Sequence, residues 1–395
     1  MGKNTIKLVN EARWTDGLVV SNRLNDITYE PMRSQEDFIM RLVRENSKTV
    51  YGKFMGFSRI SSLQDFRQRV PLTTYEDYSD YIERIANGEK NILTAYLTEH
   101  FSLLSGYKKL PVSRWDAQMA YDYQFCSCFY VAGCHGLLSD GMTLNLVDNN
   151  MERLSTKVTV GNLLGRLLVR RKFDSKDIYV LPVEATSQGE NEDPNYQQAL
   201  LALSQKDVSM AMCEHFSYML DLLRYIEKHW PRLAYDIEHG TALLQPNPER
   251  ANEIREIMEE HHIGTQMVGQ LWPGLHCMMI YDVDSLNASF ELLRTYCGKN
   301  IHFMFTGIST PEGTFSTTLH LDDPQTVLIP DSVFYEFKPT EADDYRHLLT
   351  LDQLEIGRSY ELVVTTLSGL YRYKTYKTFT VVGRYHDTPT VICQS

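Results

Sequence analysis

Long apolar runs are missing from this sequence. The longest apolar stretch, near 126–134, is broken by Ser127 and Gly133 and is too short to cross a bilayer. The first residues hold no extended apolar segment of the kind that a secretory signal needs. We therefore expect a cytoplasmic protein without a membrane span.

Positive charge is also scarce. The 395 residues include 39 lysines and arginines against 51 aspartates and glutamates, which gives a formal net charge of −12. Such a surface repels the phosphates of nucleic acids and the anionic lipids of membranes. We therefore expect neither nucleic acid nor a membrane as a partner.

The cysteines form no metal-binding pattern. There are seven, an odd number, and only Cys126, Cys128 and Cys134 cluster. In a helix, positions 126 and 128 would point to different sides. No second cysteine pair is present to complete a zinc site. We expect reduced core cysteines and no zinc.

The remaining composition is that of a globular protein with more than one core. Hydrophobic residues make up 43% and charged residues 23%. The first hundred residues predict helices separated by short turns, one of them over 37–45. Ser61 with Gln64, and Thr73 with Glu76, each resemble a capping box. Asn87-Gly88 is expected to end the helix that follows the second box.

The later segments predict a mixture of helices and strands. Helices are expected over about 115–131, over 196–230 and from Asn247-Pro248 onward. The runs 141–147 and 177–183 are candidate strands. The last third is β-rich, and only one helix, about 285–296, lies between its first two pieces. This order favours an α/β sandwich followed by a small β-barrel.

Several phrases, taken in order, resemble the GH3 family, the acyl-acid amido synthetases of auxin and jasmonate metabolism and their bacterial relatives. The match extends from about residue 36 to nearly the last residue. The phrases are VPLTTYEDYSDYIERIANGE at 70–89, HWPRLAYDIEHGT and NPERA within 229–251, LWPGL at 271–275, FYEF at 334–337, GRSYELVVTTLSGLYRY at 357–373 and VVGRYHDTP at 381–389.

The resemblance implies the large N-terminal domain of an adenylate-forming ligase. It would fill 1–395, with a helical start over about 1–100, layered α/β sandwich subdomains over 100–330 and a β-rich barrel portion over 331–395 that ends at the hinge. The small C-terminal domain would be absent from this chain, and a partner chain could supply it. In the family, a carboxylic acid and ATP with Mg form an acyl-adenylate, which an amino acid converts to an amide.

The first ATP motif of the family is a phosphate loop of serine, glycine, threonine and small residues before a lysine and a proline. This sequence keeps Ser105, Gly106 and Lys109, but the small-residue middle is deleted and bulky Tyr107 follows the glycine. A loop of this kind cannot wrap a triphosphate in the usual way. The alternative is a tight turn between two strands.

The second motif is represented by ISTPEG at 308–313. Glu312 and Gly313 match the family, so the resemblance implies Glu312 as the candidate Mg ligand. Ile308 stands where the family has an aromatic residue that stacks on adenine. Pro311 stands at the hydroxyl position and has no N–H for a phosphate.

The third motif ends in an aspartate that accepts hydrogen bonds from both ribose hydroxyls. Tyr371 and Arg372 match it, whereas Lys377 occupies the aspartate position and Tyr376 the preceding glycine. An ammonium group has three donors and no acceptor, so Lys377 cannot replace the aspartate. We expect Tyr376 to fill space where the nucleotide would lie.

Three interpretations of the function stay open. The first is an acyl-acid amido synthetase whose ATP-dependent catalysis is absent or severely weakened. The second is a pseudoenzyme or scaffold that binds a small carboxylic acid, an acyl chain or a protein partner. The third is an ATP-independent acyl transferase that reuses the acyl pocket, for which Cys134, His135 and Ser105 are the first residues to test.

Overall fold

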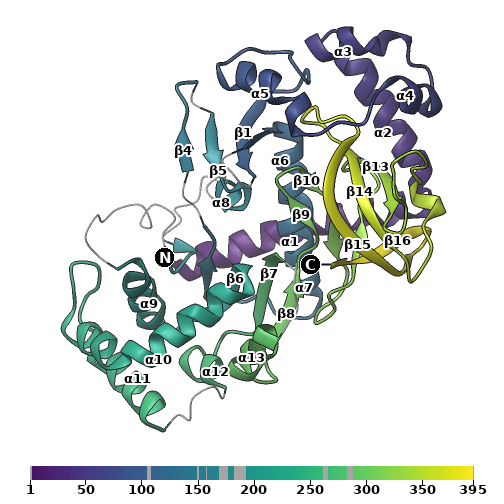
Figure 1. Cartoon of the computed structure of the whole chain (residues 1–395). Helices are drawn as coiled ribbons and strands as arrows, with labels where there is room; N and C mark the ends of the chain where they lie inside the picture. The colour runs from purple at the N-terminus through teal and green to yellow at the C-terminus, as the bar shows by residue number, and fades with distance from the viewer. Residues whose placement is uncertain are drawn as a thin grey trace.

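Figure 1 shows the computed structural model of the chain. The structure describes residues 2–104, 108–148, 151–156, 158–168, 177–181, 193–260, 266–282 and 288–394. The α-helices are α1 Gly2–Tyr29, α2 Pro31–Asn46, α3 Val50–Met55, α4 Leu63–Arg69, α5 Ser79–Ala86, α6 Arg114–Ala120, α7 Ser127–Cys134, α8 Leu163–Leu168, α9 Pro194–Ser204, α10 Phe216–His239, α11 Pro248–Glu260, α12 Met267–Leu271 and α13 Ala288–Cys297.

The strands that the structure describes form four sheets. A parallel sheet has the order β3-β6-β7-β8, a mixed sheet β2-β1-β5-β4, an antiparallel sheet β11-β12-β16-β15-β14-β13, and a short hairpin joins β9 and β10. The strands are β1 Thr98–Leu103, β2 Lys109–Ser113, β3 Met142–Leu146, β4 Met151–Arg153, β5 Thr159–Gly161, β6 Val208–His215, β7 Cys277–Asp282, β8 His302–Phe305, β9 Ser309–Thr310, β10 Gly313–Thr314, β11 Ser316–Thr318, β12 Thr326–Leu328, β13 Phe334–Pro339, β14 Ser359–Thr365, β15 Tyr373–Tyr385 and β16 Thr388–Gln394.

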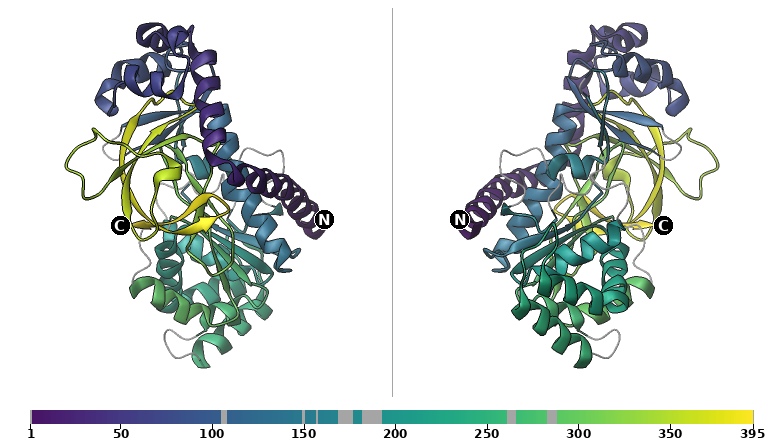
Figure 2. Two further views of the ribbon diagram at one scale, coloured as in Figure 1. Left: turned by 90° about the vertical axis from the view of Figure 1, so that its right-hand side faces the viewer. Right: turned by 90° about the vertical axis from the view of Figure 1, so that its left-hand side faces the viewer.

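The parallel sheet is covered by helices on both faces. On one face, Met278 and Ile280 of β7 pack in a core with α9, α10 and α13. On the other face, Cys277 and Met279 pack in a second core with α1 and with the helical stretch that ends in α7. Figures 1 and 2 show this layering, with α1 behind the sheet and α10 in front of it. Burial on both faces explains why β7 and β8 are largely apolar along their length.

The six-stranded antiparallel sheet packs against the first helices of the chain. Phe38, Ile39 and Leu42 of α2 are buried in one core with residues of β13, β14 and β15. The side chain of Gln35 crosses this contact, because its amide nitrogen donates to the carbonyl of Val333 at 2.7 Å and its oxygen accepts from the backbone of Tyr335 at 2.7 Å. Residues about 300 positions apart are thereby held together.

Many elements agree with the sequence prediction, and so does the α/β class. The predicted helix over 37–45 is α2, the strand over 141–147 is β3, and the helix that begins at Asn247-Pro248 is α11. The predicted helix over 115–131 is one helical stretch of three pieces, α6, a π-helical segment Tyr121–Cys126 and α7. The second capping box lies one residue later than predicted, at Thr74, and the first is replaced by a simple N-cap at Ser62.

Three predictions about the middle of the chain were wrong. The segment 196–230 is not one helix, because strand β6 lies between α9 and α10. The predicted strand over 177–183 is, within its described residues, a single bridge from Tyr179 to Thr143. The last third, expected to be β-rich with one helix between its first two pieces, also contains the short helix α12 before β7. Among the helices that the structure describes, none is long and apolar enough to cross a membrane.

Candidate functional site

A cavity of about 380 Å³ lies beyond the carboxyl ends of the parallel strands. Asp148 follows β3, Glu214 is the next-to-last residue of β6, and Tyr281 is near the end of β7; all three line the cavity. Crevices outside the carboxyl ends of parallel strands are the usual ligand sites of open α/β sheets. The volume is within the range of small-molecule sites.

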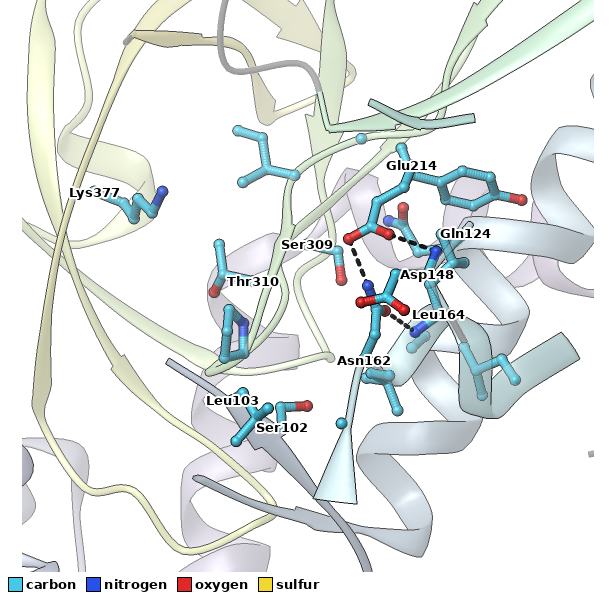
Figure 3. A pocket seen from close by; sticks show the side chains of 18 of the residues that line it. Ser102, Leu103, Gln124, Asp148, Asn162, Leu164, Glu214, Ser309, Thr310 and Lys377 are labelled. Carbon is cyan, nitrogen blue, oxygen red and sulfur yellow. Dashed lines mark hydrogen bonds between the residues drawn. The ribbon is translucent and has the colours of Figure 1, made fainter. Parts of the chain in front are cut away.

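The cavity wall combines apolar and polar side chains from segments that are far apart in the sequence (Figure 3). The lining residues are Ser102, Leu103, Ala120, Gln124, Asp148, Gly161, Asn162, Leu163, Leu164, Leu167, Glu214, Tyr281, Gly307, Ile308, Ser309, Thr310, Pro311, Lys377 and Cys393. Gln124 comes from the π-helical segment, a kind of irregularity that is frequent at functional sites.

Glu214 fixes the acidic side of the cavity. Its Oε2 accepts a hydrogen bond from the backbone N–H of Asp148 at 3.0 Å, and its Oε1 accepts one from the amide of Asn162. The Asn162 oxygen in turn accepts from the N–H of Leu164 at 2.8 Å, at the start of α8. Figure 3 shows this chain of bonds. The sequence analysis missed Glu214 because it assigned its segment to a helix.

The opposite wall is the segment that leads into the β9–β10 hairpin. Gly307 has φ +114°, and a Cβ atom there would lie 2.2 Å from the carbonyl oxygen of Ser316, so only glycine fits. The N–H of Ile308 donates to the Ser316 hydroxyl at 2.8 Å. These contacts place Ile308 and Pro311 on the cavity wall.

Glu312 lies beneath this wall and does not line the cavity. It is 6% exposed, and its Oε2 accepts a hydrogen bond from the Thr310 hydroxyl at 2.6 Å. Burial raises the pKa of Glu312, while the Thr310 bond and the charge of Lys377 oppose that rise. A buried carboxylate near an ammonium group is poorly suited to a divalent cation. The described residues contain no cluster of three or more His, Cys, Asp or Glu that could hold a metal ion.

Lys377 comes from β15 and lines the cavity. Figure 3 shows its side chain reaching toward the cavity from the side opposite Asp148 and Asn162. The expectation that Tyr376 fills the space of a nucleotide stays a prediction. The Tyr376 side chain is 64% exposed and is not part of the cavity wall. Its φ of +58° is one that glycine adopts more readily.

The structure describes only the residues on either side of the predicted phosphate loop, up to 104 and from 108. Ser105, Gly106 and Tyr107 lie outside the described residues. The strands on either side are antiparallel neighbours, and Leu103 is paired with Lys109. The backbone N–H of Lys109 donates to the Tyr75 hydroxyl at 3.3 Å, and Lys109 is not among the cavity residues. A nucleotide role for these residues stays a prediction.

Tyr371 and Arg372 are buried outside the cavity wall. The Tyr371 hydroxyl donates to the carbonyl of Leu93 at 2.8 Å. The Arg372 guanidinium pairs with buried Glu336 and also donates to the carbonyl of Val70 at 2.8 Å. These bonds give both side chains a structural role in the core. Their assignment as nucleotide contacts stays a prediction.

The other candidates lie away from the cavity. Gly313 is in β10, facing the side chains of Phe315 and Val333. Cys134 ends α7 and is exposed, as is His135 beside it. Neither of the last two lines the cavity.

Ser102 is a cavity residue that the sequence analysis did not identify. It lies in β1, is 3% exposed, and its hydroxyl has no hydrogen-bond partner in the part of the chain that the structure describes. A buried hydroxyl without a partner carries an energetic penalty of about 1–3 kcal/mol. In Figure 3 this hydroxyl points into the cavity on the side of Asn162. A ligand atom in the cavity would satisfy it.

Comparison with known proteins identifies the family. The model of the GH3 family N-terminal domain matches residues 20–301, and that of the GH3 family central domain matches residues 326–394. The indole-3-acetic acid-amido synthetase GH3.2 of Arabidopsis thaliana is 24% identical over 93% of this chain and 74% of its own length. The 4-substituted benzoates-glutamate ligase GH3.12 of the same plant is 24% identical over 93% of this chain and 69% of its own length.

Solved structures agree on the fold. The AtGH3.15 acyl acid amido synthetase in complex with 2,4-DB superposes with a TM-score of 0.82 at 22% identity, over 96% of this chain and 70% of that one. A second structure of GH3.15 gives a TM-score of 0.78. The two family models together cover most of the sequence, from residue 20 to residue 394. The chain therefore belongs to the GH3 family.

Proposed function

We propose that this protein binds a small carboxylic acid or acyl group in the cavity and that its ATP-dependent acyl activation is lost or severely weakened. The named relatives are amido synthetases and a benzoate–glutamate ligase, which supports a ligase ancestry. The main support for the proposal is where the charged side chains of Lys377 and Glu312 lie. Lys377 lines the cavity, whereas Glu312 is buried behind its wall.

The residues present do not fit a nucleotide with its metal. The Glu312 carboxylate, which the family resemblance offers for Mg, is buried, accepts a hydrogen bond from Thr310 and is not among the cavity residues. Pro311 has no N–H to donate to a phosphate. The Lys377 ammonium can donate hydrogen bonds but cannot accept them from the two ribose hydroxyls. Loss of stacking at Ile308 would remove a further ~1–3 kcal/mol per base.

The same residues suit an anion with an apolar body. Leu103, Leu164 and Ile308 offer apolar surface, and the Lys377 ammonium is a cation for a carboxylate. The partnerless Ser102 hydroxyl adds a donor on the wall. The relatives' names refer to indole-3-acetic acid, 4-substituted benzoates and 2,4-DB, which are acids with an aromatic body.

Two acidic residues, Asp148 and Glu214, line the cavity, and their charges repel a bound carboxylate only weakly. Both oxygens of Glu214 accept hydrogen bonds, from the N–H of Asp148 and from the Asn162 amide. Asp148 lies at the exposed edge of the cavity, where water and salt screen its charge. Lys377, on the side of the cavity opposite Asp148, is therefore expected to attract the carboxylate of a ligand.

The alternatives have less support. The proposed nucleophiles Cys134 and His135 do not line the cavity, and Ser105 lies outside the described residues. Among the residues that the structure describes, no contact favours acyl transfer over acid binding. A scaffold role, a partner chain that supplies the remaining part of the relatives, and a cytoplasmic location stay predictions of the sequence.

Calorimetric titration tests the proposal. Indole-3-acetate, a 4-substituted benzoate and 2,4-DB are titrated into the protein with and without Mg-ATP. We expect one acid class to bind without nucleotide. Lys377→Met should weaken it about tenfold or more, because a hydrogen bond to a charged group contributes roughly 1.5–3 kcal/mol.

Lys108→Met is the matched control. Lys108 lies outside the cavity, where its ammonium pairs with Glu76 at 2.7 Å, so its loss should leave acid affinity unchanged. Acid binding that appears only with Mg-ATP would contradict the proposal. So would equal effects of the two lysine substitutions.

A further inference from the structure

The hydroxyl of Ser102 is a buried polar group on the cavity wall. Ser102 lies in β1 and is 3% exposed. Among the cavity residues that the structure describes, Ser102 alone has a buried polar side-chain atom without a hydrogen-bond partner. Figure 3 shows this hydroxyl pointing into the cavity on the side of Asn162. The cavity is therefore the place where a ligand can supply the missing partner.

The neighbouring strands explain why the hydroxyl is not paired within the protein. In the mixed sheet, Ser102 is paired with Gly161 of β5 and with Leu110 of β2. Side chains of paired residues lie on the same face of a sheet and are the nearest to one another. Gly161 has no side chain, and the side chain of Leu110 has no polar atom. The fold thus holds the hydroxyl between two side-chain positions that cannot bind it.

His100 lies two residues earlier on the same face of β1, but its ring is engaged elsewhere. Its Nε2 lies 3.1 Å from the carbonyl oxygen of Gly161, which only accepts, so Nε2 carries the hydrogen. Burial lowers the pKa of His100 to about 4, so the ring is neutral near neutral pH. Its Nδ1 then accepts from the Thr159 hydroxyl at 2.9 Å. Both ring nitrogens are thereby used, and neither serves Ser102.

Other polar side chains of the wall form their hydrogen bonds within the protein. The Gln124 amide donates to the carbonyl of Ser316 at 3.2 Å and accepts from the Thr306 hydroxyl at 2.8 Å. The Asn162 amide is likewise bonded at both its nitrogen and its oxygen. These side chains are held in place by the fold, whereas the hydroxyl of Ser102 is left for a molecule in the cavity.

A ligand hydroxyl is the best match for this position. An apolar ligand group beside Ser102 would leave the serine hydroxyl unpaired, and such a site discriminates against analogues that lack the polar atom. A ligand hydroxyl can both donate to the serine and accept from it. A charged group fits less well, because Glu214, which binds Asn162 on this side, would repel an anion. Both oxygens of Glu214 already accept hydrogen bonds, so a cation also lacks a free counter-charge there.

We propose that Ser102 is a specificity-determining residue of this cavity and that it selects acids with a hydroxyl group remote from the carboxylate. Lys377 reaches toward the cavity from the side opposite Asn162, whereas Ser102 lies on the side of Asn162 (Figure 3). The carboxylate meets Lys377, the ligand hydroxyl meets Ser102, and the apolar body of the acid fills the space between them. This inference rests on the proposed function, because it requires that the cavity binds acids.

Straight-chain ω-hydroxycarboxylic acids of increasing length are the probes for titration calorimetry. Each is measured beside the acid in which a methyl group of similar size replaces the hydroxyl. At the best length, the ratio of hydroxy-acid affinity to methyl-acid affinity should be about tenfold or more lower in Ser102→Ala than in wild type. Ser102→Cys, which is similar in shape but a weak donor, should also lose most of this preference.

Ser209→Ala is the matched control. Ser209 of β6 is 5% exposed, and its hydroxyl donates to the carbonyl of Gly141 at 2.9 Å, outside the cavity. Its loss should leave the affinity ratio unchanged but lower the thermal midpoint, because a buried hydrogen bond is broken. Ser102→Ala removes no hydrogen bond within the described part of the protein and should not lower the midpoint.

An affinity ratio that is the same in wild type and in Ser102→Ala would overturn the inference while leaving acid binding intact. So would tighter binding of an ω-amino acid than of the ω-hydroxy acid of equal length. If an aromatic acid binds but no acid of the straight-chain series does, the inference fails and the proposed function stands. If no acid binds at all, both fail.

Discussion

Arg372 forms a bidentate ion pair with the buried carboxylate of Glu336. Its Nε lies 2.7 Å from Oε2, and its Nη2 lies 2.9 Å from Oε1. Arg67 reaches the same carboxylate from α4, with Nε 2.9 Å from Oε1. An arginine that the family resemblance assigns to the nucleotide thus ties the start of β15 to β13 and α4.

Substitution of Arg372 should therefore destabilise the fold. Arg372→Met leaves Glu336 buried with one partner, and breaking a buried pair is associated with a loss of about 3–5 kcal/mol. Urea unfolding measures the loss. Arg33→Met is the control, because Arg33 and its partner Glu30 are both exposed, and its effect should stay within about 0.5 kcal/mol. An equally stable Arg372→Met protein would show that this pair does not hold the sheet.

The buried carboxyl group of Asp116 should lower the free energy of unfolding as the pH rises from about 4 to about 6. Burial raises the pKa of Asp116 from 3.8 to about 6, and the hydroxyls of Ser368 and Ser113, which donate to it, oppose that rise. Between those pH values the folded state keeps a proton that the unfolded state has released, so the free energy of unfolding decreases with pH. Two pKa units correspond to about 3 kcal/mol.

The measurement compares the free energy of unfolding of wild type and Asp116→Asn from pH 4 to pH 7. The wild-type value minus the variant value should fall by about 3 kcal/mol across this range. His100 acts in the opposite direction, because burial lowers its pKa from 6.5 to about 4, so wild type alone cannot separate the two. A pH-independent difference between the two proteins would contradict the burial of Asp116.

Glu312 should behave as a structural carboxyl group rather than a metal ligand. Burial raises its pKa above the ordinary 4.5, so its ionisation destabilises the fold as the pH rises through the folded-state value. Glu312→Gln keeps an oxygen for the Thr310 hydroxyl and should gain stability relative to wild type with increasing pH. Millimolar Mg²⁺ should leave the thermal midpoint of both proteins unchanged. A Mg²⁺-dependent rise in wild type that Glu312→Gln lacks would restore the metal site.

Asp148 and Lys377 should affect acid binding with opposite signs. Both line the cavity, from opposite sides in Figure 3. Asp148→Asn removes a negative charge at the exposed edge and should strengthen binding of a carboxylate a few-fold, more at low salt than at high salt. Lys377→Met should weaken it. Calorimetry at two salt concentrations measures both, and a weaker-binding Asp148→Asn would mean that the ligand presents a positive group there.

The sequence correctly predicted helices that are marked by an apolar periodicity or a capping residue within their own segment. The apolar face with Phe38, Ile39 and Leu42 identified α2, and Asn247-Pro248 identified the start of α11. Strand β6 was missed because a strand buried on both faces has no alternation, and its Met and Ala residues favour helices. That error hid Glu214 and, with it, the acidic side of the cavity.

The candidate site was only partly accessible from sequence. Motif comparison located Ile308, Pro311 and Lys377, which all line the cavity. It could not show that Glu312 is buried, because the neighbouring side chains of a tight hairpin decide which residue is covered. Ser102 gives no sequence signal, since the missing hydrogen-bond partner that marks it can be seen only in the folded structure.

Titration of Mg-ATP into the purified protein is the most direct test of the central claim. The proposal predicts no heat of binding at millimolar nucleotide, while an acid of the relatives' type binds to the same sample. Lys377→Asp, which returns the family's acceptor to its position, is the companion protein. Clear one-site binding of Mg-ATP to the wild-type protein would contradict the account and would return this chain to the ATP-dependent ligases.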